Sequence, residues 1–202
     1  MVNTVHVVAD VEGTKARLRS EARDLYLEVG IARFSLREVA RRAGVSPAAV
    51  YRHFDSKEAL LDEVCAAGFR QFGAYLIRSL GEPTPRARLL RAAELYLLFA
   101  TENPRDYRVI FMGDVEAFST LHEKKTAPEP TFQFLIDRVR ECIAARVLAP
   151  GDEAELAAMI WAHVHGLTSL YLSGLFHHAG DRPAFTLFYT RSVERLLAGL
   201  AP

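Results

Sequence analysis

The chain has 202 residues, 50% of them hydrophobic and 25% charged, which is ordinary for a globular protein with a substantial core. It shows no apolar run of transmembrane length and no basic, apolar leader, and its two cysteines are far apart, so we expect a cytoplasmic protein. The formal net charge is zero, but residues 14–57 carry ten Lys or Arg against five Asp or Glu, which concentrates positive charge in one segment.

The first part of the chain is expected to form an arm and then one helix. Residues 1–13 have no clear helical period and are predicted to be a flexible N-terminal arm. A helix is predicted from about Thr14 to Val29, where Gly30 ends it. Its apolar face contains Leu18, Ala22, Leu25, Tyr26 and Val29.

Residues 34–60 are typical of two short helices around a tight turn. The first helix has one apolar face, and Gly44 ends it because glycine readily adopts the left-handed conformation of a helix stop. Ser46 followed by Pro47 is an N-cap with proline at the first helical position, so a second helix starts there and runs to about His53. Ser56 caps the next helix. This order predicts a DNA-binding helix-turn-helix.

The details of this segment resemble the N-terminal domain of TetR-family transcriptional regulators. The resemblance covers roughly residues 14–69 and rests on Phe34-Ser35, Val39-Ala40, Ala43-Gly44-Val45-Ser46, Val50-Tyr51-Arg52-His53-Phe54 and Ser56-Lys57-Glu58. It implies a DNA-binding domain over residues 14–57, continuing into the helix from Ser56. Residues 58–202 would then form an effector-binding and dimerisation domain.

The resemblance also suggests which residues contact DNA. Tyr51, His53 and Lys57 fall on positions that the family uses to hold the phosphate backbone, and Ser35 could donate a hydrogen bond to it. The exposed start of the second helix offers Pro47, Ala48 and Ala49, which suit a thymine methyl group, whereas Arg37 and Arg52 are candidates for a guanine edge. Arg41 and Arg42 are either further backbone contacts or surface charge.

The rest of the chain is also predicted to be helical, and no segment alternates as a strand would. We therefore predict an all-α fold of about nine helices. A polar loop is expected at 124–130, and the last two helices, which are the most apolar, are expected to pair with their copies in a homodimer. The expected helices cover about 56–80, 85–101, 104–112, 114–123, 131–146, 153–176 and 183–200.

Trp161, His165 and Gly166 resemble a Trp-x-x-x-His-Gly (WHG) arrangement found in one group of TetR-type C-terminal domains. Trp161 and His165 share one helix face and either line an effector pocket or belong to the core or an interface, with Gly166 permitting a close helix crossing. Most of the many aromatic rings in this half of the chain are expected to be ordinary core, and the family resemblance implies that some of them could enclose a pocket for a small apolar or aromatic effector. The candidate pocket residues are Tyr96, Phe99, Tyr107, Phe111, Phe132, Trp161 and His165.

No catalytic constellation or phosphate-binding glycine loop stands out, so we expect neither an enzyme nor a cofactor. The pairs His163/His165 and His177/His178 lack further ligands at metal-site spacing, so no metal site is expected. The resemblance implies a transcriptional regulator, more specifically a repressor released from a palindromic operator by a small molecule, and this is the favoured function. The alternatives are a small-molecule binding protein or enzyme-like domain with a vestigial helix-turn-helix, and an architectural DNA binder without an effector.

Overall fold

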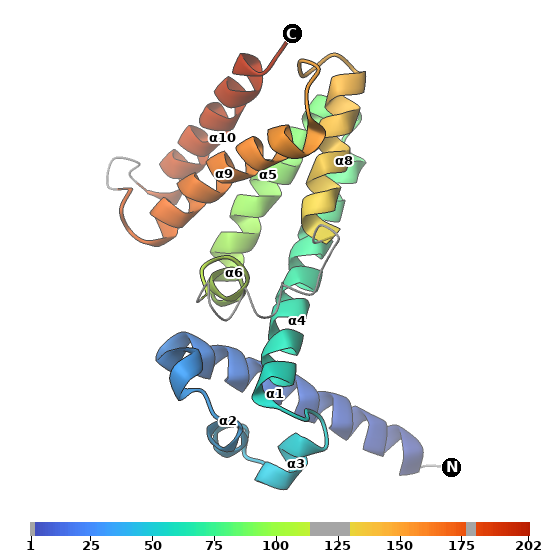
Figure 1. Ribbon diagram of the computed structural model, residues 1–202, viewed down its shortest axis with the longest axis vertical. Helices are drawn as coiled ribbons and strands as arrows, with labels where there is room; N and C mark the ends of the chain where they lie inside the picture. The colour runs from blue at the N-terminus through green and yellow to red at the C-terminus, as the bar shows by residue number, and fades with distance from the viewer. Residues whose placement is uncertain (1–2, 114–129, 177–180) are drawn as a thin grey trace. The chain divides into compact units, whose positions relative to one another are not determined.

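The structure is a computed structural model that describes residues 3–113, 130–176 and 181–202, and nine α-helices and one 3-10 helix lie within these ranges (Figure 1). The described residues contain no strand, so the predicted all-α fold is confirmed. By packing, the chain divides into two units. The N-terminal unit takes the described residues of Met1–Arg70 and Arg105–Thr126, and the C-terminal unit those of Gln71–Pro104 and Ala127–Pro202.

The N-terminal unit has a small apolar core to which every one of its helices contributes. Its helices are α1 (Asn3–Arg33), α2 (Leu36–Ala43), α3 (Pro47–Tyr51), the first part of α4 (Lys57–Ile77) and α6 (Pro104–Phe111) from Arg105 onward. The most buried apolar side chains are Leu18, Ala22, Leu25, Val39, Ala40, Val50, Leu60, Tyr107 and Val109. The predicted face of the first helix is therefore the buried one.

The first helix starts earlier than the sequence pattern predicts, at Asn3 instead of Thr14. Gly13 does not stop it, because a single glycine in a helix costs only about 1 kcal/mol relative to alanine. The predicted stop at Gly30 is confirmed, since this residue leaves the helical conformation with φ 69° and ψ 173°. The flexibility of residues 1–13 stays a prediction.

Within the N-terminal unit, α6 is held against α1 and α4. Arg23 on α1 bonds Asp106 at 3.1 Å, and Arg105 bonds Asp24 at 2.9 Å, so two neighbouring residues of α6 pair with two neighbouring residues of α1. On the α4 side, a Cβ atom added to Gly68 would lie 2.7 Å from Ile110 Cγ2. Glycine therefore permits this close approach of the two helices.

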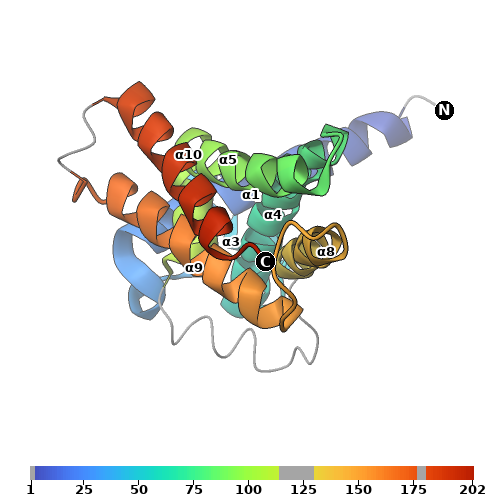
Figure 2. The same cartoon turned by 90° about the horizontal axis from the view of Figure 1, so that it is seen from above.

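The helices of the C-terminal unit are the end of α4, η1 (Arg78–Gly81), α5 (Pro85–Glu102), α8 (Pro130–Ala144), α9 (Glu153–Leu172) and α10 (Arg182–Gly199). They form a bundle around α5. Helix α5 packs against α8, α9 and α10, and α9 also contacts α8 and α10 (Figure 2). In this unit Tyr189, from α10, donates a hydrogen bond to the carbonyl of Ala93 on α5 at 2.8 Å.

Most predicted helix ends in the C-terminal unit lie within a few residues of the observed ones. Thr84, Asp152 and Asp181 cap α5, α9 and α10 through their side-chain oxygens. Helix α9 stops at Leu172 and not near Phe176, because Gly174 adopts φ 69° after it. The helix predicted at 114–123 and all but the last residue of the polar loop at 124–130 lie outside the described residues.

Candidate nucleic-acid interface

Local hydrogen bonds build the helix-turn-helix as the sequence predicts. Ser35 Oγ accepts a bond from the N–H of Glu38 and begins α2, and Gly44, at φ 68°, ends it. Ser46 Oγ then accepts from the N–H of Ala49 at 3.2 Å, with Pro47 at the first helical position. Each end is satisfied by a residue next to it in sequence, so the turn depends little on the remainder of the chain.

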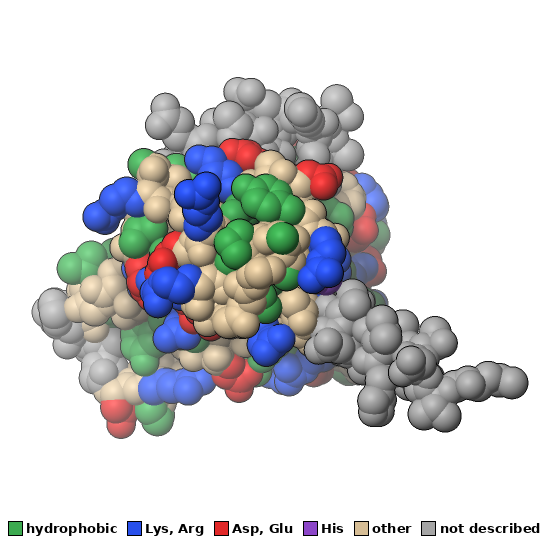
Figure 3. Space-filling view, turned by 90° about the horizontal axis from the view of Figure 1, so that it is seen from below, with side chains coloured by type: hydrophobic (Ala, Val, Ile, Leu, Met, Phe, Trp, Pro, Cys, Tyr) green, Lys and Arg blue, Asp and Glu red, His purple; other side chains and the backbone are tan. Residues whose placement is uncertain are grey.

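Helix α3 presents small and aromatic groups outward. Pro47, Ala48, Tyr51 and Arg52 are exposed, with Tyr51 at 55%. Ala49 is buried beside Val50, so its methyl group faces the core and is not available to a thymine. The helix also ends at Tyr51 and is shorter than the predicted span to His53. Viewed from the side of α2 and α3, Lys and Arg side chains, with some Asp and Glu among them, lie around a surface of hydrophobic side chains, other side chains and backbone (Figure 3).

Three cations of the helix-turn-helix segment are available to a ligand. Arg37 and Arg52 are exposed, and no described residue forms an ion pair or hydrogen bond with their side chains. The Lys57 ammonium lies 4.0 Å from the Glu58 carboxylate, which is a loose contact. His53 is half-buried, with its ring 6.3 Å from that of Phe54, so only part of its imidazole is exposed.

Two other arginines of α2 are already paired with acids, which the sequence analysis did not anticipate. Arg41 donates two bonds to Glu38, at 2.6 and 2.8 Å, and Arg42 reaches both Glu38 at 3.1 Å and Glu28 at 2.7 Å. Hydrogen bonds from Arg41 and then Arg42 lower the pKa of Glu38 to about 2. Glu38 precedes Arg41 by three residues and Arg42 by four, and this helical spacing could have predicted both of its pairs from the sequence.

The C-terminal unit brings five of the seven candidate pocket residues into one chain of ring contacts. Phe132 lies 5.9 Å from Trp161, Trp161 lies 5.8 Å from His165, and His165 lies 6.5 Å from Tyr96. Through Phe72 the chain continues to Phe99. These rings come from α4, α5, α8 and α9, so they form a cluster, here called the aromatic cluster, across the unit.

The Tyr96 hydroxyl and His165 Nδ1 are hydrogen-bonded at 2.9 Å within this cluster. Burial lowers the pKa of His165, so its imidazole is neutral at neutral pH. An added Cβ at Gly166 would meet no atom within 4 Å, so Gly166 makes no close helix crossing within the described part of this chain, and the interface alternative stays open. Trp161 is 38% exposed and therefore not a core residue.

Tyr107 and Phe111 belong to the N-terminal unit, not to the aromatic cluster. Their rings lie 5.2 Å apart, and Phe111 also contacts Phe69 at 5.9 Å. Tyr107 is completely buried. Both residues therefore pack in the unit that contains the helix-turn-helix.

Comparison with known proteins matches both parts of the chain to one family. Residues 18–64 match the profile of bacterial regulatory proteins of the tetR family. Residues 89–198, more than half of the chain, match the profile of the tetracyclin repressor-like C-terminal domain. The chain belongs to the TetR family. It is thus a DNA-binding transcriptional regulator with a helix-turn-helix head and a helical C-terminal domain, as the sequence analysis predicts. The Trp-His-Gly group stays a prediction.

Individual relatives are distant. The chain is 27% identical to the nucleoid occlusion factor SlmA of Photobacterium profundum, over 80% of this chain and 84% of the relative. It is 37% identical to the HTH-type transcriptional repressor KstR2 of Rhodococcus jostii, over 31% of each chain. The structure of the TetR family regulator PfmR from Thermus thermophilus has the same fold. It superposes with a TM-score of 0.66 at 20% identity, over 92% of this chain and 100% of the other.

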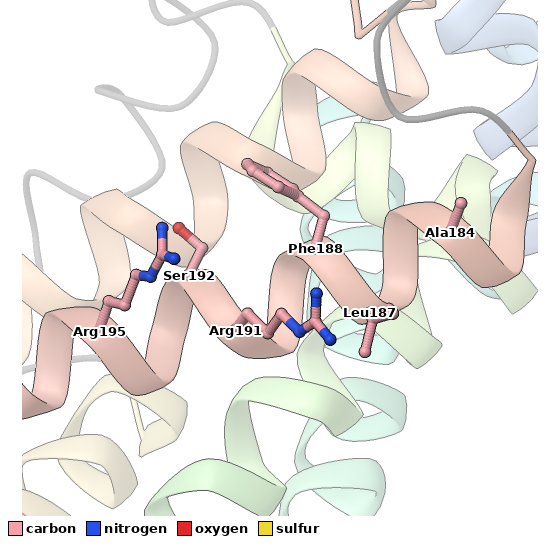
Figure 4. Close-up of a pocket in the computed structure, with 6 residues that line it drawn as sticks. All are labelled: Ala184, Leu187, Phe188, Arg191, Ser192 and Arg195. Carbon is pink, nitrogen blue, oxygen red and sulfur yellow. The ribbon is translucent and has the colours of Figure 1, made fainter.

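The last two helices of this TetR-family chain have exposed apolar side chains. On α9 these include Met159 and Leu170, and on α10 Leu187 and Phe188. His163 on α9 is hydrogen-bonded to the Ser192 hydroxyl on α10 at 3.0 Å, which links the two helices. A shallow groove runs along the outer side of α10, and Figure 4 shows the residues that line it: Ala184, Leu187, Phe188, Arg191, Ser192 and Arg195.

Two further observations bear on other classes of function. Among the described residues, no group of three or more His, Cys, Asp or Glu is placed to hold a metal ion. His177 and His178 lie outside the described residues. No helix in the described ranges has the length and apolar character needed to cross a membrane.

Proposed function

We propose that the chain is a homodimeric repressor that binds a palindromic operator through α2, α3 and the start of α4. The observation that carries this proposal is the outward face of the capped helix-turn-helix. It combines the small exposed groups of Pro47 and Ala48 with the guanidinium groups of Arg37 and Arg52, which have no partner among the described residues. Small groups permit close approach to base edges, and free cations bind phosphates or guanine.

The polar side chains on this face are proposed to make different kinds of DNA contact. Arg37 lies at the exposed start of α2 and is proposed to read a guanine edge, with Arg52 as a second candidate. Tyr51 and Lys57 are proposed to hold the phosphate backbone, because a phenol hydroxyl and an ammonium both donate hydrogen bonds to phosphate. Ser35 Oγ is already used as a helix cap, so its hydroxyl hydrogen remains for a phosphate oxygen.

The homodimer is proposed to form through α9 and α10. Their outer sides expose leucine, methionine and phenylalanine side chains that a second copy would cover. A two-fold axis through this surface makes the contact self-complementary. The two recognition helices of such a dimer would enter successive major grooves, about 34–36 Å apart.

The effector is proposed to bind beside the aromatic cluster of the C-terminal unit. Rings from four helices and the neutral Tyr96–His165 pair suit a small apolar or aromatic molecule, in keeping with the partly exposed Trp161. Such a molecule would release DNA only if it binds the DNA-free dimer more tightly than the DNA-bound one. Unchanged operator affinity with every molecule shown to bind the protein would refute this release mechanism.

Selection of bound sequences from a random duplex pool, at a stated salt concentration, tests the main proposal. A palindromic consensus is the expected result, since each half-site meets one protomer. Only weak binding with a steep salt dependence and no consensus would contradict the proposal. In that case the C-terminal unit would carry the function and the helix-turn-helix would be vestigial.

Two substitutions then separate base reading from phosphate binding. We expect Arg37→Ala to weaken the binding free energy for the consensus duplex by about 1–3 kcal/mol and to relax the base preference at one position of each half-site. We expect Lys57→Ala to weaken all duplexes alike and to lower the salt slope by about 1. Arg86→Ala, which removes an exposed cation of the C-terminal unit, is the control. An Arg37→Ala protein with unaltered preferences across a panel of site variants would exclude the base-reading role.

A further inference from the structure

The acidic residue Glu38 lies within the proposed DNA-binding helix and engages two arginines. Its Oε1 atom accepts from Arg41 Nη2 at 2.6 Å and from Arg42 Nε at 3.1 Å, and its Oε2 atom accepts from Arg41 Nε at 2.8 Å. Arg42 is held a second time by Glu28, at 2.7 Å, whereas Arg41 has no other ion-pair partner among the described residues. The arrangement around Arg41 is therefore a two-bond fork that depends on Glu38 alone.

Arg41 has the position of a DNA contact but lacks a free charge. It follows Arg37 by four residues, so the two side chains share one face of α2. Its side chain is 72% exposed, and the pair with Glu38 therefore stands in solvent on the same side as the proposed base reader. Of these two exposed arginines, Arg41 is neutralised by Glu38, whereas Arg37 pairs with no acid in the part of the chain that the structure describes.

This difference affects specificity because phosphate contacts and base contacts contribute to different quantities. A cation that reaches a phosphate strengthens binding to every duplex and steepens the salt dependence by about 0.9 for each contact on B-DNA. A base contact strengthens binding to the operator alone. An exposed single ion pair contributes little stability. A bidentate Arg–carboxylate pair within a network of charges, here Glu28, Glu38, Arg41 and Arg42, is more stable.

We propose that Glu38 is a specificity-determining residue that holds Arg41 away from the phosphate backbone and so keeps non-specific binding weak. The proposal deepens the DNA-binding role proposed above and rests on α2 facing the duplex. Glu38 acts through Arg41 and is thus a positioning residue. Arg42 contributes less, because Glu28 would still hold it if Glu38 were absent.

Glu38→Gln tests this role, because glutamine keeps the shape of the side chain and removes its charge. Binding to a random-sequence duplex and to the selected operator would be measured across a salt series. We expect the salt slope on random duplex to steepen by about 0.9, which corresponds to about eightfold tighter binding at 0.1 M salt relative to a 1 M reference. The ratio of operator to random affinity should fall, since one more contact becomes independent of sequence.

Arg41→Gln and the double variant separate this explanation from simple repulsion between Glu38 and DNA. If Glu38 acts by holding Arg41, Glu38→Gln should change nothing once Arg41 is absent. An equal gain in both backgrounds would mean that the carboxylate only repels phosphate, and the proposal would be overturned. An unchanged slope in the single variant would overturn it as well.

Glu153→Gln is the matched control, because Glu153 accepts bonds from Arg140 Nε at 2.8 and 3.0 Å in the C-terminal unit. It changes the net charge by the same amount, so an equal gain of DNA affinity there would also contradict the proposal. A failure to select any consensus would count against the proposed repressor function. The salt slopes on random duplex would still decide the role of Glu38.

Discussion

Replacing Gly68 with alanine tests how closely α6 packs on α4 in the N-terminal unit. The added Cβ would lie 2.7 Å from Ile110 Cγ2, whereas carbon atoms make favourable contacts at about 3.5–4.0 Å. Ile110 is 3% exposed and β-branched, so its methyl group cannot rotate away freely. Overpacking costs about 1–3 kcal/mol, and alanine gains about 1 kcal/mol over glycine in a helix. We therefore expect the free energy of unfolding to fall by about 1 kcal/mol.

The effect of Gly68→Ala should also be measured in a protein that carries Ile110→Ala. Ile110→Ala costs about 2–5 kcal/mol by itself, but it removes the methyl group that the new Cβ would meet. In that background, Gly68→Ala should stabilise the protein by about 1 kcal/mol, so the sign of its effect reverses. Urea denaturation at one fixed protein concentration gives the free energy of unfolding of the wild type and the three variants.

A glycine on the same helix provides the control for this cycle. A Cβ at Gly73 would meet Thr131 Cγ2 at 3.8 Å, which is an ordinary contact. Gly73→Ala should therefore stabilise the protein by about 1 kcal/mol in any background. If Gly68→Ala destabilised the wild type and the Ile110→Ala protein equally, the clash with Ile110 would not be the cause.

Two further predictions concern the C-terminal unit. Leu187→Glu should yield a folded monomer that has lost operator affinity, because it places a charge in the proposed dimer surface. Sedimentation would show this, and Leu80→Glu, at an exposed leucine on η1, should remain dimeric. Because burial lowers the pKa of His165, the unfolded chain takes up its proton first, so stability should decline as the pH falls below 6.5. His165→Gln should flatten that decline in denaturation midpoints, and an unchanged pH dependence would exclude this histidine as its source.

The helix-turn-helix was predictable from sequence because its determinants are local. Ser35, Gly44, Ser46 and Pro47 each cap or stop a helix within a few residues of their own position, and the structure has these caps where the sequence indicates them. For helix α3, the local sequence was not sufficient to predict which residues are buried. The helix is one turn long, so periodicity could not show that Ala49 is buried and Ala48 is exposed.

The sequence could not predict that the candidate pocket residues divide between the two units. Tyr96 and Tyr107 are both buried aromatic residues on amphipathic helices, and composition does not distinguish them. They belong to different units because the chain crosses from one unit to the other at Pro104 and Arg105, between α5 and most of α6. That assignment depends on contacts between residues far apart in sequence, such as Arg23 with Asp106.

The positive charge of residues 14–57 was also predictable only in part. Its surplus of five cations correctly indicates a partner with negative charge, but the count does not show which cations remain available. Arg19 is bound by Glu63, from another helix 44 residues away, and Arg42 by Glu28. Pairing of this kind is tertiary, so it removes cations from the interface without altering the net charge of the segment. Among the cations of residues 34–60, Arg37 and Arg52 have no acidic partner in the described ranges and Lys57 has only a loose contact with Glu58, so the proposed interface relies on these three.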